Sequence, residues 1–82
     1  MNHIKLLFFA TLRDRAGTKS MELDIPADLT VQGLKDQISA EYPTLKESMS
    51  SVLITINREY AFDDAIIPQN AELAMFPPVS GG

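Results

Sequence analysis

The chain has 82 residues, 45% of them hydrophobic and 22% charged, a length that excludes a second domain and a composition that excludes intrinsic disorder. Seven Lys and Arg against eleven Asp and Glu give a net charge of −4, which argues against nucleic-acid and anionic membrane partners, because both need clustered cations. No cation follows Arg58, so the acidic C-terminal third suits a basic protein partner. A chain this short leaves little room for an enclosed active site, and we expect it to act through its surface.

The sequence contains no cysteine and a single histidine, His3. These counts exclude disulfides, thiolate metal sites and thiol nucleophiles, and one histidine cannot form a metal cluster. The apolar run 6–10 is followed at once by charged residues and is far too short to span a bilayer. We therefore expect a cytoplasmic protein with no metal site of its own.

The first half of the chain predicts two strands and a helix. Residues 4–10 form an apolar strand, and residues 20–25 alternate between apolar and acidic side chains, as a half-buried antiparallel partner strand would. The charged segment 11–19 is expected to turn the chain between them. Thr30 is placed as a helix N-cap, with Leu29 and Leu34 at the positions of a hydrophobic staple. The helix should end near Glu41, before Pro43.

The second half predicts further strands joined by turns. Residues 52–56 are a β-branched strand, residues 57–59 a turn into a short strand, and residues 71–76 the last strand. The segments 63–64 and 68–70 are expected to be turns. The predicted order is β-β-α-β-(short β)-β, which indicates an α+β domain.

One helix covers only one face of such a sheet, so apolar side chains on the other face need a separate explanation. Alternation along the strands places Leu7, Phe9 and Phe76 on the face away from the helix, and Tyr60 is a further candidate. Contiguous exposed apolar residues usually mark an interface. The sequence thus predicts a protein-docking surface.

No self-contained catalytic motif is present: the chain lacks a phosphate-binding glycine-rich loop, a nucleophile elbow and a metal-binding His-Glu helix. Adjacent Asp63 and Asp64 fit a solvated turn, and His3 fits a fraying surface residue near the terminus. The isolated chain is not expected to be an enzyme.

The C-terminus forms a second candidate site. We divide the chain into a domain of residues 1–76 and a flexible functional tail of residues 77–82. Two prolines followed by Val79, Ser80 and two glycines favour an extended path that ends in residues without Cβ. The α-carboxylate at its tip becomes an acyl donor only after activation, for instance by a nucleotide, and a partner must supply that chemistry.

Three segments carry a resemblance to a known family: 7–13 (LFFATLR), 54–59 (ITINRE) and 74–82 (AMFPPVSGG). Together they resemble the small, sulfur-carrying subunit of molybdopterin synthase, also called molybdopterin converting factor subunit 1, in the superfamily of ubiquitin-like sulfur carriers. The resemblance covers nearly the whole chain. It departs before the last strand, where residues 68–72 (PQNAE) replace the family's usual Asp-Gly-Asp-Glu turn.

The resemblance implies a β-grasp (ubiquitin-like) fold, with a mixed sheet of four to five strands, one main helix on one face and an extended C-terminal tail. It also implies a sulfur-carrier cycle. An adenylating, E1-like enzyme uses ATP and Mg²⁺ to activate Gly82, and a sulfur donor such as a cysteine desulfurase or a rhodanese-type protein converts it to a thiocarboxylate. The thiocarboxylate tail then enters the active site of the large catalytic subunit, in a heterotetramer of two small and two large subunits. There its sulfur passes to cyclic pyranopterin monophosphate, forming the molybdopterin dithiolene of the molybdenum cofactor.

The resemblance also assigns residues to roles. Gly81 and Gly82 carry the reacting terminus, and the isolated chain binds no cofactor. The partner-binding residues are expected to be Phe9, Arg13, Tyr60, Phe76, Pro77, Pro78, Val79 and Ser80, with a salt bridge expected for Arg13. Three alternatives remain open: a carrier for thiamine thiazole synthesis, a ubiquitin-like protein modifier, and a binding module with an inert tail.

Overall fold

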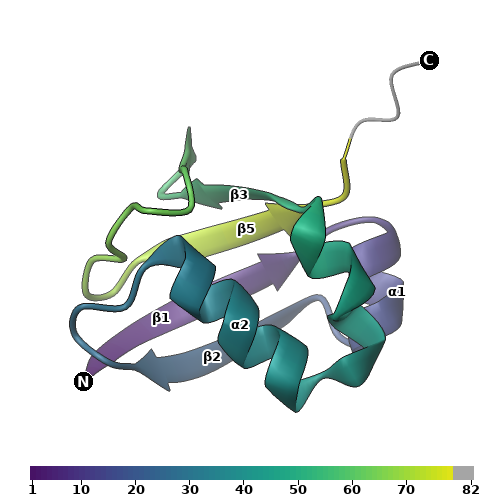
Figure 1. Cartoon of the computed structure of the whole chain (residues 1–82), viewed down its shortest axis with the longest axis horizontal. Coiled ribbons are helices and arrows are strands. Elements are labelled where there is room, and N and C mark those ends of the chain that lie inside the picture. The colour runs from purple at the N-terminus through teal and green to yellow at the C-terminus, as the bar shows by residue number, and fades with distance from the viewer. Residues whose placement is uncertain (79–82) are drawn as a thin grey trace.

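The computed structural model describes residues 1–78, and they form a five-stranded sheet with one long helix across it (Figure 1). The strands are β1 (Asn2–Phe8), β2 (Ser20–Ile25), β3 (Leu53–Ile56), β4 (Glu59–Tyr60) and β5 (Glu72–Phe76). Their order in the sheet is β2-β1-β5-β3-β4, in which β1 and β5 are parallel and the other pairs antiparallel. This mixed sheet of five strands confirms the predicted fold class.

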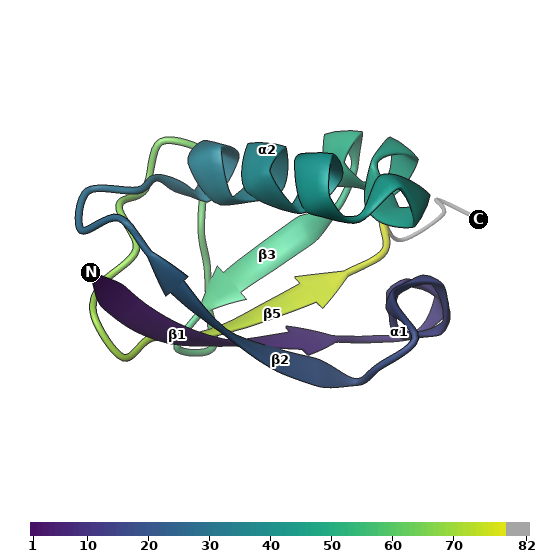
Figure 2. The ribbon, with the colours of Figure 1, turned by 90° about the horizontal axis from the view of Figure 1, so that it is seen from below.

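Helix α2 (Val31–Glu41) begins and ends where the sequence predicts. The Gly33 N–H donates to the Thr30 side-chain oxygen at 3.1 Å, which confirms the N-cap. Figure 2 shows α2 lying along one face of the sheet, while the opposite face carries no helix within residues 1–78. Two short 3₁₀ helices, Pro43–Leu45 and Glu47–Ser50, connect α2 to β3.

A short helix, α1 (Thr11–Ala16), occupies the segment that was expected to be only a turn, so that prediction was wrong. Leu12 is buried against the core, and Gly17 ends the helix in a left-handed conformation with φ 75°. The first strand is also two residues earlier than predicted, because the chain leaves the sheet after Phe8 to enter α1. Both differences place Phe9 and Arg13 beside the end of the sheet.

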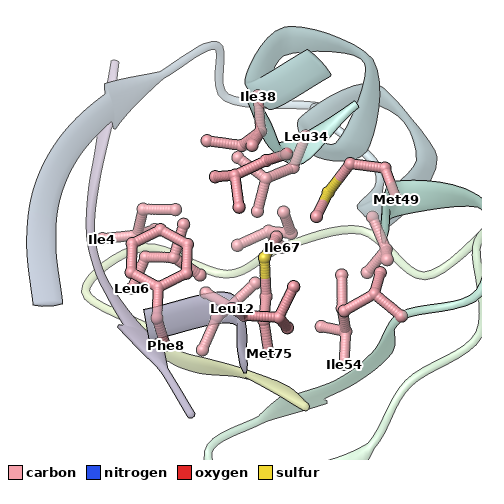
Figure 3. Close-up of a cluster of buried hydrophobic side chains, with 14 of the residues drawn as sticks. Ile4, Leu6, Phe8, Leu12, Leu34, Ile38, Met49, Ile54, Ile67 and Met75 are labelled. Carbon is pink, nitrogen blue, oxygen red and sulfur yellow. The ribbon is translucent and has the colours of Figure 1, made fainter. Parts of the chain in front are cut away.

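The core lies between α2 and the sheet (Figure 3). Alternate residues of β1 and β5 point into it: Ile4, Leu6 and Phe8 from β1, and Leu73 and Met75 from β5, all at most 2% exposed. Leu34 and Ile38 close it from α2. Because side chains alternate along a strand, Leu7, Ala74 and Phe76 lie on the other face, as the sequence predicts.

Two turns contain residues with positive φ, a conformation that Asn tolerates better than most residues. Asn57 and Arg58 (φ 50° and 73°) join β3 to β4, and Asn70 (φ 61°) precedes β5. The Asn57 side-chain oxygen also accepts from the Glu72 N–H at 3.0 Å, which ties this turn to β5. Asn70 therefore serves at the turn where the sequence departs from the family pattern, and the fold is kept.

Candidate functional site

The face of the sheet opposite α2, here called the open face, carries an apolar cluster near the end of β5. The rings of Phe9 and Phe76 stack with their centroids 4.7 Å apart and an angle of 11° between planes. Leu53 pairs with Phe76 across β3 and β5 and is 37% exposed, and Phe9 is 40% exposed. The structure therefore brings together the two phenylalanines that the sequence predicts, and it adds Leu53.

The stacked pair owes its position to two local features. The Phe9 N–H donates to the Met75 carbonyl oxygen at 3.2 Å, which continues the β1–β5 pairing beyond the last residue of β1. Ala10 then adopts φ 53° and ψ −129°, a conformation that favours glycine, and turns the chain into α1. Strained residues of this kind often accompany functional sites.

Tyr60 lies in β4 and is 78% exposed. It pairs with Thr55, which in turn pairs with Ala74 in β5. Since paired residues share a face, Tyr60 belongs to the open face, as the sequence predicts. It is separated from the Phe9–Phe76 pair by β3 and lies toward the β4 edge of the open face.

Arg13 projects from α1 beside the aromatic pair. Together with Lys5 and Lys19 it lines a hollow of about 320 Å³ whose floor includes Leu7 and Phe9. Within residues 1–78 Arg13 has no carboxylate at ion-pair distance, so the expected salt bridge is not formed within this part of the chain. The sequence reasoning missed the two lysines, because their approach to Arg13 depends on helix α1.

A charged cluster on the open face was also missed. The His3 ring lies between two carboxylates of β2, with Nδ1 2.9 Å from Asp24 Oδ1 and Nε2 2.8 Å from Glu22 Oε1. Two hydrogen bonds raise the pKa of His3 above its ordinary value of 6.5; the bond to Glu22 has the larger effect and the bond to Asp24 the smaller. His3 is held in β1, so its description as a fraying residue was wrong; the β1–β2 register would have revealed the cluster.

The tail begins directly at the apolar cluster. β5 ends at Phe76, and Pro77 and Pro78 follow outside any strand, Pro77 half-buried and Pro78 exposed. The predicted site residues Val79, Ser80, Gly81 and Gly82 lie outside the described residues. Within the described part, no helix is long and apolar enough to cross a membrane, and no group of three metal-ligating side chains is placed to hold an ion.

The open face and the sheet order define a β-grasp, ubiquitin-like domain that presents an apolar cluster next to its C-terminal segment. The chain belongs to the ThiS family, which matches residues 6–82.

Individual proteins that resemble this chain were compared with it in sequence and in structure. The chain is 39% identical over 79 residues to a molybdopterin synthase sulfur carrier subunit from Arabidopsis thaliana, covering 96% of this chain and 82% of the relative. It superposes on the crystal structure of SAMP1 from Haloferax volcanii with a TM-score of 0.83 and 30% identity, covering 99% and 100% of the two chains. A complex of subunits 1 and 2 of the molybdopterin-converting factor from Helicobacter pylori contains a chain of the same fold, with a TM-score of 0.69, 20% identity and coverage of 98% and 99%.

Proposed function

We propose that this protein is the sulfur carrier of molybdopterin synthase and acts in molybdenum cofactor biosynthesis as a non-catalytic subunit. The observation that carries the proposal is the 39% identity to a molybdopterin synthase sulfur carrier subunit over 96% of the chain. The apolar cluster beside the C-terminal segment supports it, since a carrier needs a surface that docks a partner and a terminus that reaches into it.

The reaction takes place at the α-carboxylate of Gly82. A carboxylate is a poor acyl donor, because its leaving group would be an oxide ion. In the proposed cycle an activating enzyme joins this carboxylate to AMP from Mg²⁺-ATP and releases pyrophosphate. The terminal sulfur of a persulfide on the donor protein then displaces AMP, and one carboxylate oxygen leaves with AMP. A thiol of the partner enzymes attacks the donor's cysteine sulfur in the resulting acyl disulfide, so that a disulfide forms on the partner side and a thiocarboxylate is left on Gly82. With no cysteine in the chain, the backbone terminus is the position that can carry transferable sulfur.

The large subunit of the synthase is the proposed acceptor partner. The complex of subunits 1 and 2 known for the Helicobacter pylori relative supports such an assembly. In our proposal Phe9, Tyr60 and Phe76 dock this subunit, Arg13 pairs with one of its carboxylates, and residues 77–82 enter its active site. There the thiocarboxylate gives its sulfur to cyclic pyranopterin monophosphate.

An intact-mass measurement tests the carrier function. The protein is incubated with its activating enzyme, Mg²⁺-ATP and a sulfur donor, and the expected product has one oxygen replaced by sulfur. Omitting ATP is the control, and the mass should then stay unchanged. A mass that never changes in the complete reaction would overturn the proposal.

The docking role of the open face has its own test. Phe76→Asp places a charge in the stacked pair and should weaken binding to the large subunit by about ten-fold or more, as expected for a buried aromatic anchor. Ala40→Asp adds the same charge on the exposed side of α2 and serves as the matched control. Equal affinities of the two variants would show that the interface lies elsewhere.

A second candidate function is protein modification. It is favoured by the 30% identity and 0.83 TM-score to SAMP1 from Haloferax volcanii, a protein that a related crystal structure calls small archaeal modifier protein 1. The two functions share terminal activation and differ in the acceptor. Higher-mass conjugates in cells that disappear when Gly82 is deleted would establish the modifier function.

A further inference from the structure

A second group of exposed apolar residues lies at the β4 edge of the sheet. Phe62 is 84% exposed and Ile66 60% exposed, both more than Phe9 at 40%. Removing apolar side chains of this size from water favours association, and contiguous exposed apolar residues usually mark an interface. With Tyr60 they form what we call the β4-edge surface. The proposed carrier function assigns no role to Phe62 or Ile66.

The segment that bears these residues is fixed to the rest of the domain. The first N–H groups of α2 donate to it, from Val31 to the Ala65 carbonyl and from Gln32 to the Asp63 carbonyl, both at 2.9 Å. Ile67 is fully buried, and its N–H donates to the Leu29 carbonyl at 3.0 Å. In Figure 1 this segment is the green part of the chain that leaves the β3 edge and returns to the start of β5. Phe62 and Ile66 are therefore presented from an anchored loop.

Two hollows flank Phe62, and each has room for a side chain of a partner. One, of about 320 Å³, is lined by Leu53, Tyr60 and Phe62 among others. The other, of about 370 Å³, lies between Tyr60, Ile66 and Pro68. Because Leu53 pairs with Phe76, the apolar surface continues from the Phe9–Phe76 pair to Phe62.

The charges around this surface indicate the chemistry of the partner. Glu59 and Asp64 line the larger hollow, and no cation among residues 1–78 lines it. Lys35 lines the smaller hollow, but its ammonium is paired with Asp63. Arg58 precedes Glu59 in the turn. The complement of such a surface is an apolar side chain flanked by Lys or Arg.

We propose that the docking surface for the large subunit extends around the sheet edge onto Phe62 and Ile66. There it binds a segment of the large subunit in which an apolar side chain lies between basic residues. This inference rests on the proposed function for the identity of the partner. The continuity through Leu53 and Tyr60 is what assigns the β4-edge surface to the same partner as the open face.

The test measures binding to the purified large subunit. It uses the full-length protein with its free C-terminal carboxylate, before any sulfur is attached. Phe62→Asp should weaken binding by about ten-fold or more, whereas Ala40→Asp should bind as the unsubstituted protein does. Thermal unfolding of Phe62→Asp should be unchanged, since the side chain is exposed. Equal affinity of Phe62→Asp and Ala40→Asp would overturn the inference, as would a loss of affinity only for the activating enzyme.

A second pair of variants tests the charge complementarity. Glu59→Gln with Asp64→Asn should weaken binding several-fold at low salt, with the difference disappearing at high salt, because exposed charge pairs are screened. Glu41→Gln with Glu47→Gln removes the same charge from exposed positions elsewhere and is the control. An identical salt dependence of both variants would contradict the basic partner segment. The intact-mass assay is independent of both measurements, so a failure of the carrier function is seen separately.

Discussion

The exposed side chain of His3 makes the folding stability of the domain depend on pH. Its two nitrogens lie 2.9 and 2.8 Å from carboxylates of Asp24 and Glu22, which favour the protonated ring. The pKa in the folded state therefore lies above the ordinary value of 6.5. A raised pKa means that the stabilisation is present in full below about 6.5 and disappears as the pH rises through the folded-state pKa.

A titration checks this expectation. NMR of the His3 ring should give a pKa above 6.5 in the unsubstituted protein, and Glu22→Gln with Asp24→Asn should return it toward 6.5. The urea midpoints of the two proteins should differ more at pH 5 than at pH 9. A His3 pKa that is the same in both proteins would show that the carboxylates do not hold the ring in solution.

Ala10 is the residue whose conformation is most unusual for its type. Its backbone angles, φ 53° and ψ −129°, are unfavourable for a residue with a Cβ. Backbone strain of this kind lowers the free energy of unfolding by on the order of 1–3 kcal/mol. Ala10→Gly should relieve this strain and raise the free energy of unfolding by about 1 kcal/mol, part of the relief being lost to the greater freedom of glycine when unfolded. Chemical denaturation measures the difference.

The control for Ala10 is Ala16→Gly, because Ala16 is the last residue of helix α1, which Ala10 precedes. It should lower the free energy of unfolding by about 0.5–1 kcal/mol. If both glycine variants lower stability equally, the strain assigned to Ala10 does not exist.

At the scale of elements, the stability of helix α2 depends on its N-cap residue, Thr30. Thr30→Ala removes the 3.1 Å bond from the Gly33 N–H and should destabilise the domain by about 1 kcal/mol. For a domain of this size that corresponds to a fall in Tm of about 4–8 °C. Thr30→Ser keeps the hydroxyl and should retain most of the stability; a Tm for Thr30→Ser as low as that for Thr30→Ala would show that the cap bond is unimportant.

The elements that could be predicted are those whose signals are local. The limits of α2 follow from a cap, a staple and Pro43, all within a few residues of its ends. Helix α1 could not be predicted in this way, because it has six residues and is held by burial of Leu12 in the tertiary structure. The same reason explains why the grouping of Lys5, Arg13 and Lys19 was missed.

The candidate site shows the same division between local and tertiary information. Strand alternation alone places Phe76 on the open face, because neighbouring residues of a strand point to opposite faces. The partnership of Phe9 with Phe76 follows from the parallel pairing of β1 and β5, which are far apart in the chain. Phe62 and Ile66 lie outside any strand, so no periodicity indicates that they are exposed.

At the scale of the whole molecule, structure and reactivity are separated along the chain. Among residues 1–78 the buried core residues lie between Ile4 and Met75, and the proposed reacting atom belongs to Gly82. The core should therefore be insensitive to changes at the C-terminal glycine. The proposed carrier cycle, with its two partner enzymes, would gain from this separation, because the terminus could be modified without cost to the fold.

One extra residue after Gly82 tests this separation. The added peptide bond converts the carboxylate of Gly82 into an amide, so the activating enzyme should form no thiocarboxylate at that glycine, while thermal unfolding stays the same as in the unmodified protein. One extra residue before Met1 is the matched control and should be activated normally. If the C-terminally extended protein gained sulfur as efficiently as this control, the transferable sulfur would reside elsewhere in the chain, and the role assigned to Gly82 would be wrong.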